Sequence, residues 1–200
     1  MSLCVIVLNI FLFFTYTIVL KNNNLLDEKT IQYIGRLDSL RHQRLAIFFS
    51  FFGTGTFIIP IYILIITRLI FTNQKYLAKL VILLSLCSLL FGIVLKEIIR
   101  KPRPQLIHLD SAGGYSFPSG HTLGIFTLSG VLIYLLWREK VSGFLKISLS
   151  IFILIIAFFV GFSRIYLHVH FASDVIGSII ITMLLLSIFY ILVCKLENPR

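Results

Sequence analysis

Residues 151–193 have the sequence IFILIIAFFVGFSRIYLHVHFASDVIGSIIITMLLLSIFYILV, in which two long apolar runs flank a short polar segment. An apolar run of about 20 residues is long enough to cross a bilayer as a helix. The polar segment FSRIYLHVHFASDV, residues 162–175, places an arginine, two histidines and an aspartate between the two runs. Ionisable side chains are costly in lipid, so we expect these groups to face protein and to carry a function.

The composition of the whole chain also indicates an integral membrane protein. Of its 200 residues, 58% are hydrophobic and 13% are charged, whereas soluble domains have roughly a half and a quarter. The length predicts one domain, residues 1–200. The formal net charge of +10 favours anionic lipid headgroups or an anionic substrate as partners. No segment combines basic and aromatic residues as a nucleic-acid surface does, so nucleic acid is not an expected partner.

The apolar runs predict six membrane-spanning helices, at about residues 2–20, 45–67, 77–97, 120–137, 146–163 and 171–193. Between the first two, Ile31, Ile34, Leu37 and Leu40 recur at three-residue spacing among charged residues. This spacing predicts an amphipathic helix at the membrane interface, either a plain connector or the border of a substrate entrance. The predicted fold is all-α: a polytopic membrane protein with six transmembrane helices and an interfacial helix between helices 1 and 2.

Six spans place both termini on one side of the membrane and bring three polar clusters together on the other. The clusters are KEIIRKPRP at residues 96–104, FPSGHT at residues 117–122, and the segment 162–175. Their convergence requires only that the spans alternate in direction. Lys and Arg are nearly balanced between the two sides, so the positive-inside rule does not decide which side faces the cytoplasm.

The first cluster combines a helix end with basic side chains. Pro102 and Pro104 disfavour helix at the residues before them, so the third span should end here. Lys96 and Arg103 then project from a helix end and an extended segment. Taken alone, this arrangement also fits basic residues that snorkel to the membrane interface.

The second cluster begins the fourth span. Pro118, Ser119 and Gly120 at a helix start leave backbone N–H groups free, and the helix dipole favours an anion there. His121 lies beside the place that such an anion would occupy. A plain cap by Ser119 with an interfacial histidine explains the cluster equally well.

The third cluster holds a histidine and an acid with helical spacing. His170 and Asp174 are four residues apart, so on a helix they share a face and the carboxylate accepts from one imidazole N–H. The other imidazole nitrogen is then free to attack. Arg164 ends the fifth span and reaches the same place, whereas His168 points elsewhere and is expected to be a loop histidine.

Together, the clusters supply the parts that phosphoryl transfer needs. Cations and a helix N-terminus hold the oxygens, one histidine attacks in line, and another protonates the leaving group. A magnesium site would require several acids, and this side has one well-placed acid, so no metal is expected.

Three sequence patterns carry a resemblance to a known family. They are Lys-x6-Arg-Pro from Lys96 to Pro104, Pro-Ser-Gly-His from Pro118 to His121, and Ser-Arg-x5-His-x3-Asp from Ser163 to Asp174. With these patterns in this order, most of the chain resembles the type 2 phosphatidic acid phosphatase superfamily of membrane lipid phosphatases. It is most similar to small bacterial members, the phosphatidylglycerophosphatases and undecaprenyl pyrophosphate phosphatases.

The resemblance implies a hydrolase without a metal or other cofactor. In such an enzyme His170 attacks phosphorus and becomes a phosphohistidine, Asp174 orients it, and His121 protonates the leaving oxygen. The phosphoryl oxygens are held by Lys96, Arg103, Ser119, Gly120 and Arg164. The implied substrate is a phosphorylated membrane lipid: phosphatidylglycerophosphate, phosphatidic acid or undecaprenyl pyrophosphate.

The resemblance also implies a location in the cytoplasmic membrane of a bacterium. The site then faces the extracytoplasmic side, and both termini lie in the cytoplasm. Four polar residues near the motifs lie outside the family pattern and receive no catalytic role: Arg100, Lys101, His108 and His168.

Two other functions fit parts of the pattern. A non-catalytic carrier of anionic lipids would use the cations but would not need His121 or the pair of His170 and Asp174. A vanadate-dependent haloperoxidase has a similar anion pocket, but its soluble character disagrees with six apolar spans. The residues leave headgroup selectivity and oligomeric state open.

Overall fold

Helices account for most of the backbone in a computed structural model, which describes residues 2–20, 25–36, 39–111 and 113–197. In chain order they are α1 (Ser2–Phe14), the π-helix η1 (Thr15–Leu20), α2 (Leu25–Gly35), α3 (Leu40–Phe51), α4 (Gly55–Phe71), α5 (Lys75–Ile99), α6 (Gly120–Arg138), α7 (Gly143–Tyr166) and α8 (Ala172–Glu197). The described residues contain no β-strand. The predicted all-α class is confirmed.

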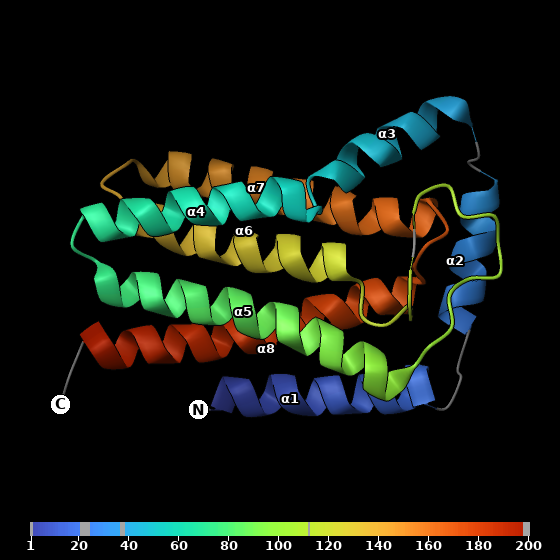
Figure 1. Ribbon diagram of the computed structural model, residues 1–200, viewed down its shortest axis with the longest axis horizontal. Coiled ribbons are helices and arrows are strands. Elements are labelled where there is room, and N and C mark those ends of the chain that lie inside the picture. Colours follow the sequence, from blue (N-terminus) through green and yellow to red (C-terminus); the bar gives the residue numbers. More distant parts are fainter. Residues whose placement is uncertain (1, 21–24, 37–38, 112, 198–200) are drawn as a thin grey trace.

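The long helices lie along one common direction, and the short α2 lies across one end of them (Figure 1). The central helix is α6, which contacts α5, α7 and α8. Around it, α1 packs on α8, α3 packs on α7, and α2 packs on the beginning of α8. The loops after α5 and α7 reach the same end as α2, so three chain segments that are distant in sequence meet there.

Five helical segments are long and apolar enough to cross a membrane: Leu40–Phe71, Lys75–Ile99, Gly120–Arg138, Gly143–Tyr166 and Ala172–Leu196. A shorter apolar helix, Val5–Thr17, occupies the place of the first predicted span. The integral membrane character agrees with the sequence analysis. Because this first helix is short, the count of six spans stays a prediction.

The second predicted span begins earlier than expected and is interrupted. It comprises α3 and α4, with a turn at residues 52–54 between them. Ser39 starts α3, because its Oγ accepts a hydrogen bond from the backbone N–H of His42 at 3.3 Å. The turn contains Gly53, where a Cβ atom would lie 2.8 Å from Cβ of His121. Only glycine allows the backbone to approach α6 so closely.

The predicted amphipathic segment forms two helices, α2 and the beginning of α3. Ile34 of α2 is buried in a cluster with Tyr166, Leu167 and Val169 of the α7–α8 turn. Leu40 belongs to α3 and is exposed, and Leu37 lies outside the described residues. Packing of α2 on the α7–α8 turn explains its orientation, and its position at the membrane interface stays a prediction.

The surface of the long helices is apolar, as a lipid-facing surface must be. Large hydrophobic side chains are exposed on the outward faces, for example Leu64, Phe71, Phe144 and Phe158. The interior contains a cluster of buried apolar side chains that includes Leu128. Since lipid tails are as apolar as these side chains, exposure to lipid costs them nothing.

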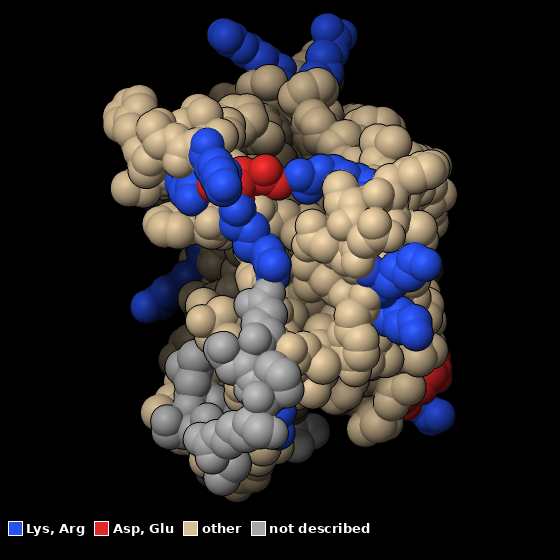
Figure 2. Space-filling view, turned by 90° about the vertical axis from the view of Figure 1, so that its left-hand side faces the viewer, with Lys and Arg blue, Asp and Glu red and all other residues tan. Residues whose placement is uncertain are grey.

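Basic side chains ring the end of the bundle where α4 joins α5 and α6 joins α7 (Figure 2). One of them, Arg68, forms an ion pair with Glu139, and both side chains are about half exposed. Exposed pairs of this kind contribute little to stability, roughly 0–1 kcal/mol. Cations at helix ends are favoured beside anionic headgroups, so this end is suited to a membrane surface.

We predict that Gly53→Ala lowers the thermal unfolding temperature of the purified protein. The added methyl group would lie 2.7 Å from Cγ1 of Val160 and 2.8 Å from Cβ of His121, so backbone must move. Overpacking of this kind costs about 1–3 kcal/mol. The matched control is Gly143→Ala, where an added Cβ meets nothing within 4 Å. Equal unfolding temperatures for the two variants would contradict the close approach at Gly53.

Candidate active site

The three polar clusters converge at the end of the bundle where α5 and α7 end and α6 and α8 begin (Figure 1). His121 lies close enough to Arg164, His170 and Lys96 to interact with them electrostatically. Lys96 interacts in the same way with Arg103, Asp174 and Arg164. Ser119 and Gly120 precede His121 at the start of α6. The structure therefore gathers all the candidate residues at one end.

A histidine and a carboxylate are paired at the start of α8. Nδ1 of His170 lies 3.5 Å from Oδ2 of Asp174, and both side chains are buried. The same oxygen accepts from the backbone N–H of Phe171 at 2.9 Å and from the hydroxyl of Ser116. These bonds fix the carboxylate so that it faces Nδ1. The other ring nitrogen of His170, Nε2, does not face this carboxylate.

The imidazole of His170 is neutral at physiological pH. Burial lowers its pKa to about 4, although the hydrogen bond and the negative charge of Asp174 act in the opposite direction. A neutral ring that donates from Nδ1 to a carboxylate carries its lone pair on Nε2. This is the form in which a histidine acts as a nucleophile.

The start of α6 is fastened to α8. The hydroxyl of Ser178 donates to the carbonyl oxygens of Ser119 at 3.1 Å and of Asp174 at 2.7 Å. Phe117 is fully buried against Gly177, where a Cβ atom would come within 2.3 Å of the ring. The hydroxyl of Ser119 accepts from Thr122 rather than from the backbone, so the first N–H groups of α6 are not capped by it. An uncapped helix start is suited to an anion.

Two of the predicted cations also hold the loop before α6. Lys96 donates from Nζ to the carbonyl oxygen of Tyr115 at 3.1 Å. Arg103 donates from Nε to Gly114 and from Nη2 to Gly113, and its Nη1 reaches the carbonyl of Val169. These bonds tie the first and third clusters together. A lysine has three donors and an arginine five, so each side chain keeps capacity for a further acceptor.

Arg164 is buried and has an acidic partner that sequence reasoning missed. Its Nη1 lies 2.6 Å from Oδ2 of Asp110 and also contacts the hydroxyl of Ser50. Burial alone would raise the pKa of Asp110, but the hydrogen bonds from Arg164, the backbone of Ser111 and Ser50 hold it below its usual range. Nε of Arg164 has no acceptor among the described residues. The sequence contains one indication of this partner: Asp110 is the only acidic residue between Glu97 and Glu139.

Lys101 is a second residue that sequence reasoning left without a role. Its Nζ lies 3.0 Å from Oδ1 of Asp174, 3.0 Å from Oδ2 of Asp27 and 2.6 Å from the hydroxyl of Ser173. Asp27 belongs to α2 and is only 2% exposed. No short-range pattern connects Asp27 with Lys101, so only the folded chain reveals this contact.

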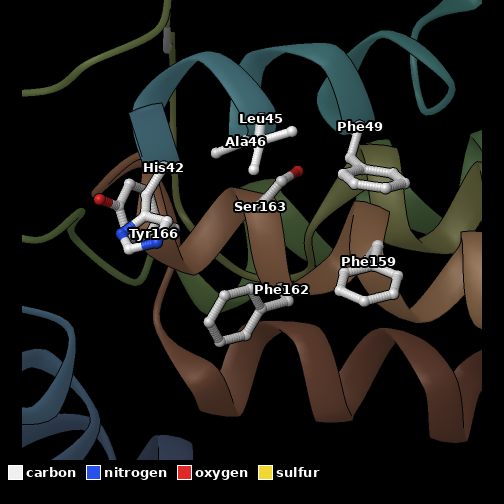
Figure 3. Close-up of a pocket in the computed structure, with 8 residues that line it drawn as sticks. All are labelled: His42, Leu45, Ala46, Phe49, Phe159, Phe162, Ser163 and Tyr166. Carbon is white, nitrogen blue, oxygen red and sulfur yellow. The ribbon is translucent and has the colours of Figure 1, made fainter. Parts of the chain in front are cut away.

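An apolar hollow lies on the outer side of the seam between α3 and α7 (Figure 3). Its volume is about 280 Å³, and it is lined by His42, Leu45, Ala46, Phe49, Phe159, Phe162, Ser163 and Tyr166. The rings of Phe49 and Phe159 stack at 4.7 Å between centroids and close one end. The neighbouring residues Ser50 and Arg164 make their hydrogen bond across the same seam.

The helical fold is that of a membrane protein. One end of its helix bundle contains a buried polar centre with a paired histidine and aspartate. The PAP2 superfamily model matches residues 75–197, which contain all three clusters. The chain belongs to the PAP2 superfamily, and the family resemblance seen in the motifs is confirmed.

Curated relatives are lipid phosphatases. Phosphatidylglycerophosphatase B of Bacillus subtilis is 32% identical over 66% of this chain and 66% of its own length. Undecaprenyl-diphosphatase BcrC of the same organism is 30% identical over 53% of this chain and 52% of its own length. The matched segments therefore leave a third or more of each relative uncovered. A crystal structure of a transmembrane PAP2-type phosphatidylglycerolphosphate phosphatase from Bacillus subtilis matches with a TM-score of 0.88 and 27% identity over 100% of both chains.

We predict that protonation of His170 destabilises the folded protein. Its folded-state pKa of about 4 lies below the value of about 6.5 in an unfolded chain. Between these values the unfolded state binds more protons, so stability falls as the pH decreases through this window. The stabilisation lost at about pH 5 should be on the order of 2 kcal/mol.

The measurement is thermal unfolding in detergent at about pH 7 and about pH 5. His170→Asn keeps a side-chain N–H near Asp174 but does not titrate, so its unfolding temperature should fall less than that of the wild type. If both proteins lose the same number of degrees, burial does not keep this imidazole neutral.

Proposed function

We propose that the chain is a metal-independent lipid phosphatase that hydrolyses the phosphate monoester or pyrophosphate headgroup of a membrane lipid through a phosphohistidine at His170. The observation that carries the proposal is the neutral His170, whose Nδ1 faces the buried carboxylate of Asp174. Candidate substrates are phosphatidylglycerophosphate, phosphatidic acid and undecaprenyl pyrophosphate. The activities named for the PAP2 relatives support the substrate class.

The reaction proceeds in two displacements at phosphorus. In the first, the lone pair on Nε2 of His170 forms the N–P bond, and the bond from phosphorus to the leaving oxygen breaks. His121, which must be the imidazolium in the complex with the phosphate dianion, donates a proton to that oxygen and becomes neutral, so the lipid product leaves as an alcohol or a lipid monophosphate. In the second, His121 accepts a proton from water as the water oxygen attacks phosphorus, which releases inorganic phosphate and restores His170. Asp174 stabilises the positive charge that the imidazole acquires.

The phosphoryl oxygens bind to the cations and to the start of α6. Nε of Arg164 is a buried donor without an acceptor among the described residues, as a donor awaiting a phosphoryl oxygen would be. The N–H of Gly120 lies at an exposed helix start, beside Ser119. Lys96 and Arg103 supply further donors, and several positive charges favour a dianionic phosphate. Asp110 holds Arg164 in place from the far side of the guanidinium.

The hollow between α3 and α7 supports a lipid as the substrate class (Figure 3). It offers an apolar surface directly beside the helix that carries Arg164. A molecule with a phosphate at one end and hydrocarbon at the other fits such a pair of environments.

The site faces the extracytoplasmic side of a bacterial cytoplasmic membrane, with both termini in the cytoplasm. This orientation comes from the family resemblance. The end of α8 lies at the opposite end of the bundle from His170, which is compatible with it (Figure 1). The test replaces the three native cysteines with alanine, introduces one cysteine at Lys140 or at Gln105, and labels intact cells with a membrane-impermeant maleimide. Labelling at 105 alone is expected, and labelling at 140 alone would reverse the orientation.

We predict that His170→Ala abolishes phosphate release from all three lipids, because no other group replaces the nucleophile. The loss should be at least about 1,000-fold in kcat. The matched control is His168→Asn: His168 lies at φ 59°, a conformation asparagine tolerates, and its Nδ1 lies 3.3 Å from the carbonyl oxygen of Ile107. Its activity should stay within about threefold of wild type. Lipid binding by the wild type without any phosphate release would instead indicate a carrier.

We predict that chelators leave turnover unchanged. Among the described residues no three His, Cys, Asp or Glu side chains lie close enough together to hold a metal ion. Phosphate release from phosphatidic acid should therefore be the same, within about twofold, in EDTA and in added Mg²⁺. Strict dependence on the added ion would overturn the proposed mechanism.

A further inference from the structure

Three charged side chains form a buried cluster, and one of them is Asp174 of the catalytic pair. Asp174, Lys101 and Asp27 have side-chain exposures of 0%, 10% and 3%. Lys101 lies between the two carboxylates, with its Nζ 3.0 Å from an oxygen of each. The ring of Phe171 lies 4.4 Å from the same Nζ, so the ammonium group is enclosed on a further side.

The two carboxylate oxygens of Asp174 have different partners. Oδ2 faces Nδ1 of His170 and accepts from Ser116 and Phe171. Oδ1 accepts from Lys101. A buried carboxylate persists as an anion only with such partners, because each unpaired oxygen carries a large desolvation cost. Lys101 is therefore one of the partners, with Ser116 and the backbone N–H of Phe171, that can keep this carboxylate charged and in place.

Lys101 has no donor left for a substrate. An ammonium group has three N–H donors, and Nζ has three acceptors on protein, namely Asp174, Asp27 and the hydroxyl of Ser173. Lys96, by contrast, donates to the carbonyl oxygen of Tyr115 and to no other protein acceptor among the described residues. The two lysines are thus distinct: Lys96 can bind a phosphoryl oxygen, and Lys101 acts only through Asp174.

Asp27 brings α2 into this arrangement. Its Oδ1 accepts from the backbone N–H of Ser173 at 2.9 Å, and its Oδ2 accepts from the hydroxyl of Ser173 at 2.6 Å and from Lys101. It therefore caps the beginning of α8 from a helix that lies outside residues 75–197, the part matched by the family model. Ile34 fastens the other end of α2 to the α7–α8 turn.

The charges of the cluster suit the reaction. Two carboxylates and one ammonium leave one net negative charge beside His170. When the imidazole attacks phosphorus it becomes positively charged, and this negative charge stabilises it. Because Asp27 shares the positive charge of Lys101, the cluster keeps a net negative charge beside His170.

We propose that Lys101 is a positioning residue that holds Asp174 toward His170, and that Asp27 of α2 balances its charge and makes α2 part of the active centre. This inference rests on the proposed function. It predicts that the N-terminal segment of the chain controls the chemical step, although no candidate residue of the sequence motifs lies in it.

The test compares variants of the full-length protein in detergent micelles with phosphatidic acid as substrate. Lys101→Met should lower kcat about 100-fold with KM changed less than about threefold, because Lys101 does not touch substrate. Lys101→Arg restores the charge and should recover kcat to within about tenfold of wild type. Asp27→Asn keeps an oxygen that can accept from the backbone N–H of Ser173 but removes the negative charge, and it should lower kcat about tenfold. The matched controls on α2 are the exposed neighbours, Glu28→Gln and Lys29→Met.

The pH dependence of kcat separates positioning from simple stabilisation. A buried carboxylate without its cation is protonated more readily. In Lys101→Met, the fall in kcat at acid pH (the acid limb of the profile) should therefore occur at a higher pH than in the wild type. In Asp27→Asn, Asp174 is the only carboxylate that pairs with Lys101. The fall in kcat at acid pH should therefore occur at the same pH as in the wild type or at a lower one. The other charged or titratable groups that act on Asp174 are His170, Lys96 and Arg103, and they are unchanged in both variants.

Two results would overturn the inference while leaving the proposed function intact. One is an acid limb at the wild-type position in Lys101→Met, with kcat lost only in proportion to unfolding. The other is a raised KM together with weaker inhibition by inorganic phosphate, which would make Lys101 a phosphate ligand. Absence of phosphate release from the wild-type protein would instead refute the proposed function itself.

Discussion

The carboxylate of Asp174 lies fully buried in the first turn of α8, and much of the structure at this end serves to keep it charged there. Its partners come from three separate segments of the chain: Ser116 before α6, Lys101 after α5, and Phe171 with His170 in the α7–α8 turn. An anion with fewer partners would take up a proton or turn toward water. Because these segments must meet around one side chain, the loop after α5 has to return across the ends of α6 and α8.

The same constraint explains why the helices approach each other so closely at this end. Gly53 brings the α3–α4 turn within contact distance of His121, and Gly177 allows the ring of Phe117 to pack directly on α8. Residues 118–121 are thereby held against α8, where Ser178 bonds to the carbonyl of Ser119. Close packing and hydrogen bonds thus hold the start of α6 against α8 at the place proposed for the phosphoryl group.

Local patterns predicted a large part of this arrangement. The apolar runs gave the long helices α5 to α8, and the four-residue spacing of His170 and Asp174 placed them on one face. Contacts between distant segments left no such signal. Asp27 and Lys101 are 74 residues apart and meet only because α2 packs on the α7–α8 turn. The turn at Gly53 was missed for a related reason: the apolar run at residues 45–67 does not show that a helix within it must bend toward another.

We expect Nε2 of His170 to become covalently phosphorylated during turnover. The most direct test is to mix the wild-type protein briefly with phosphatidic acid, quench in alkali, where phosphohistidine survives, and map the phosphorylated peptide by mass spectrometry. A single phosphorylated residue, His170, is expected. Phosphate on any other residue, or none on the protein while inorganic phosphate is released at the full rate in a pre-steady-state burst, would contradict it.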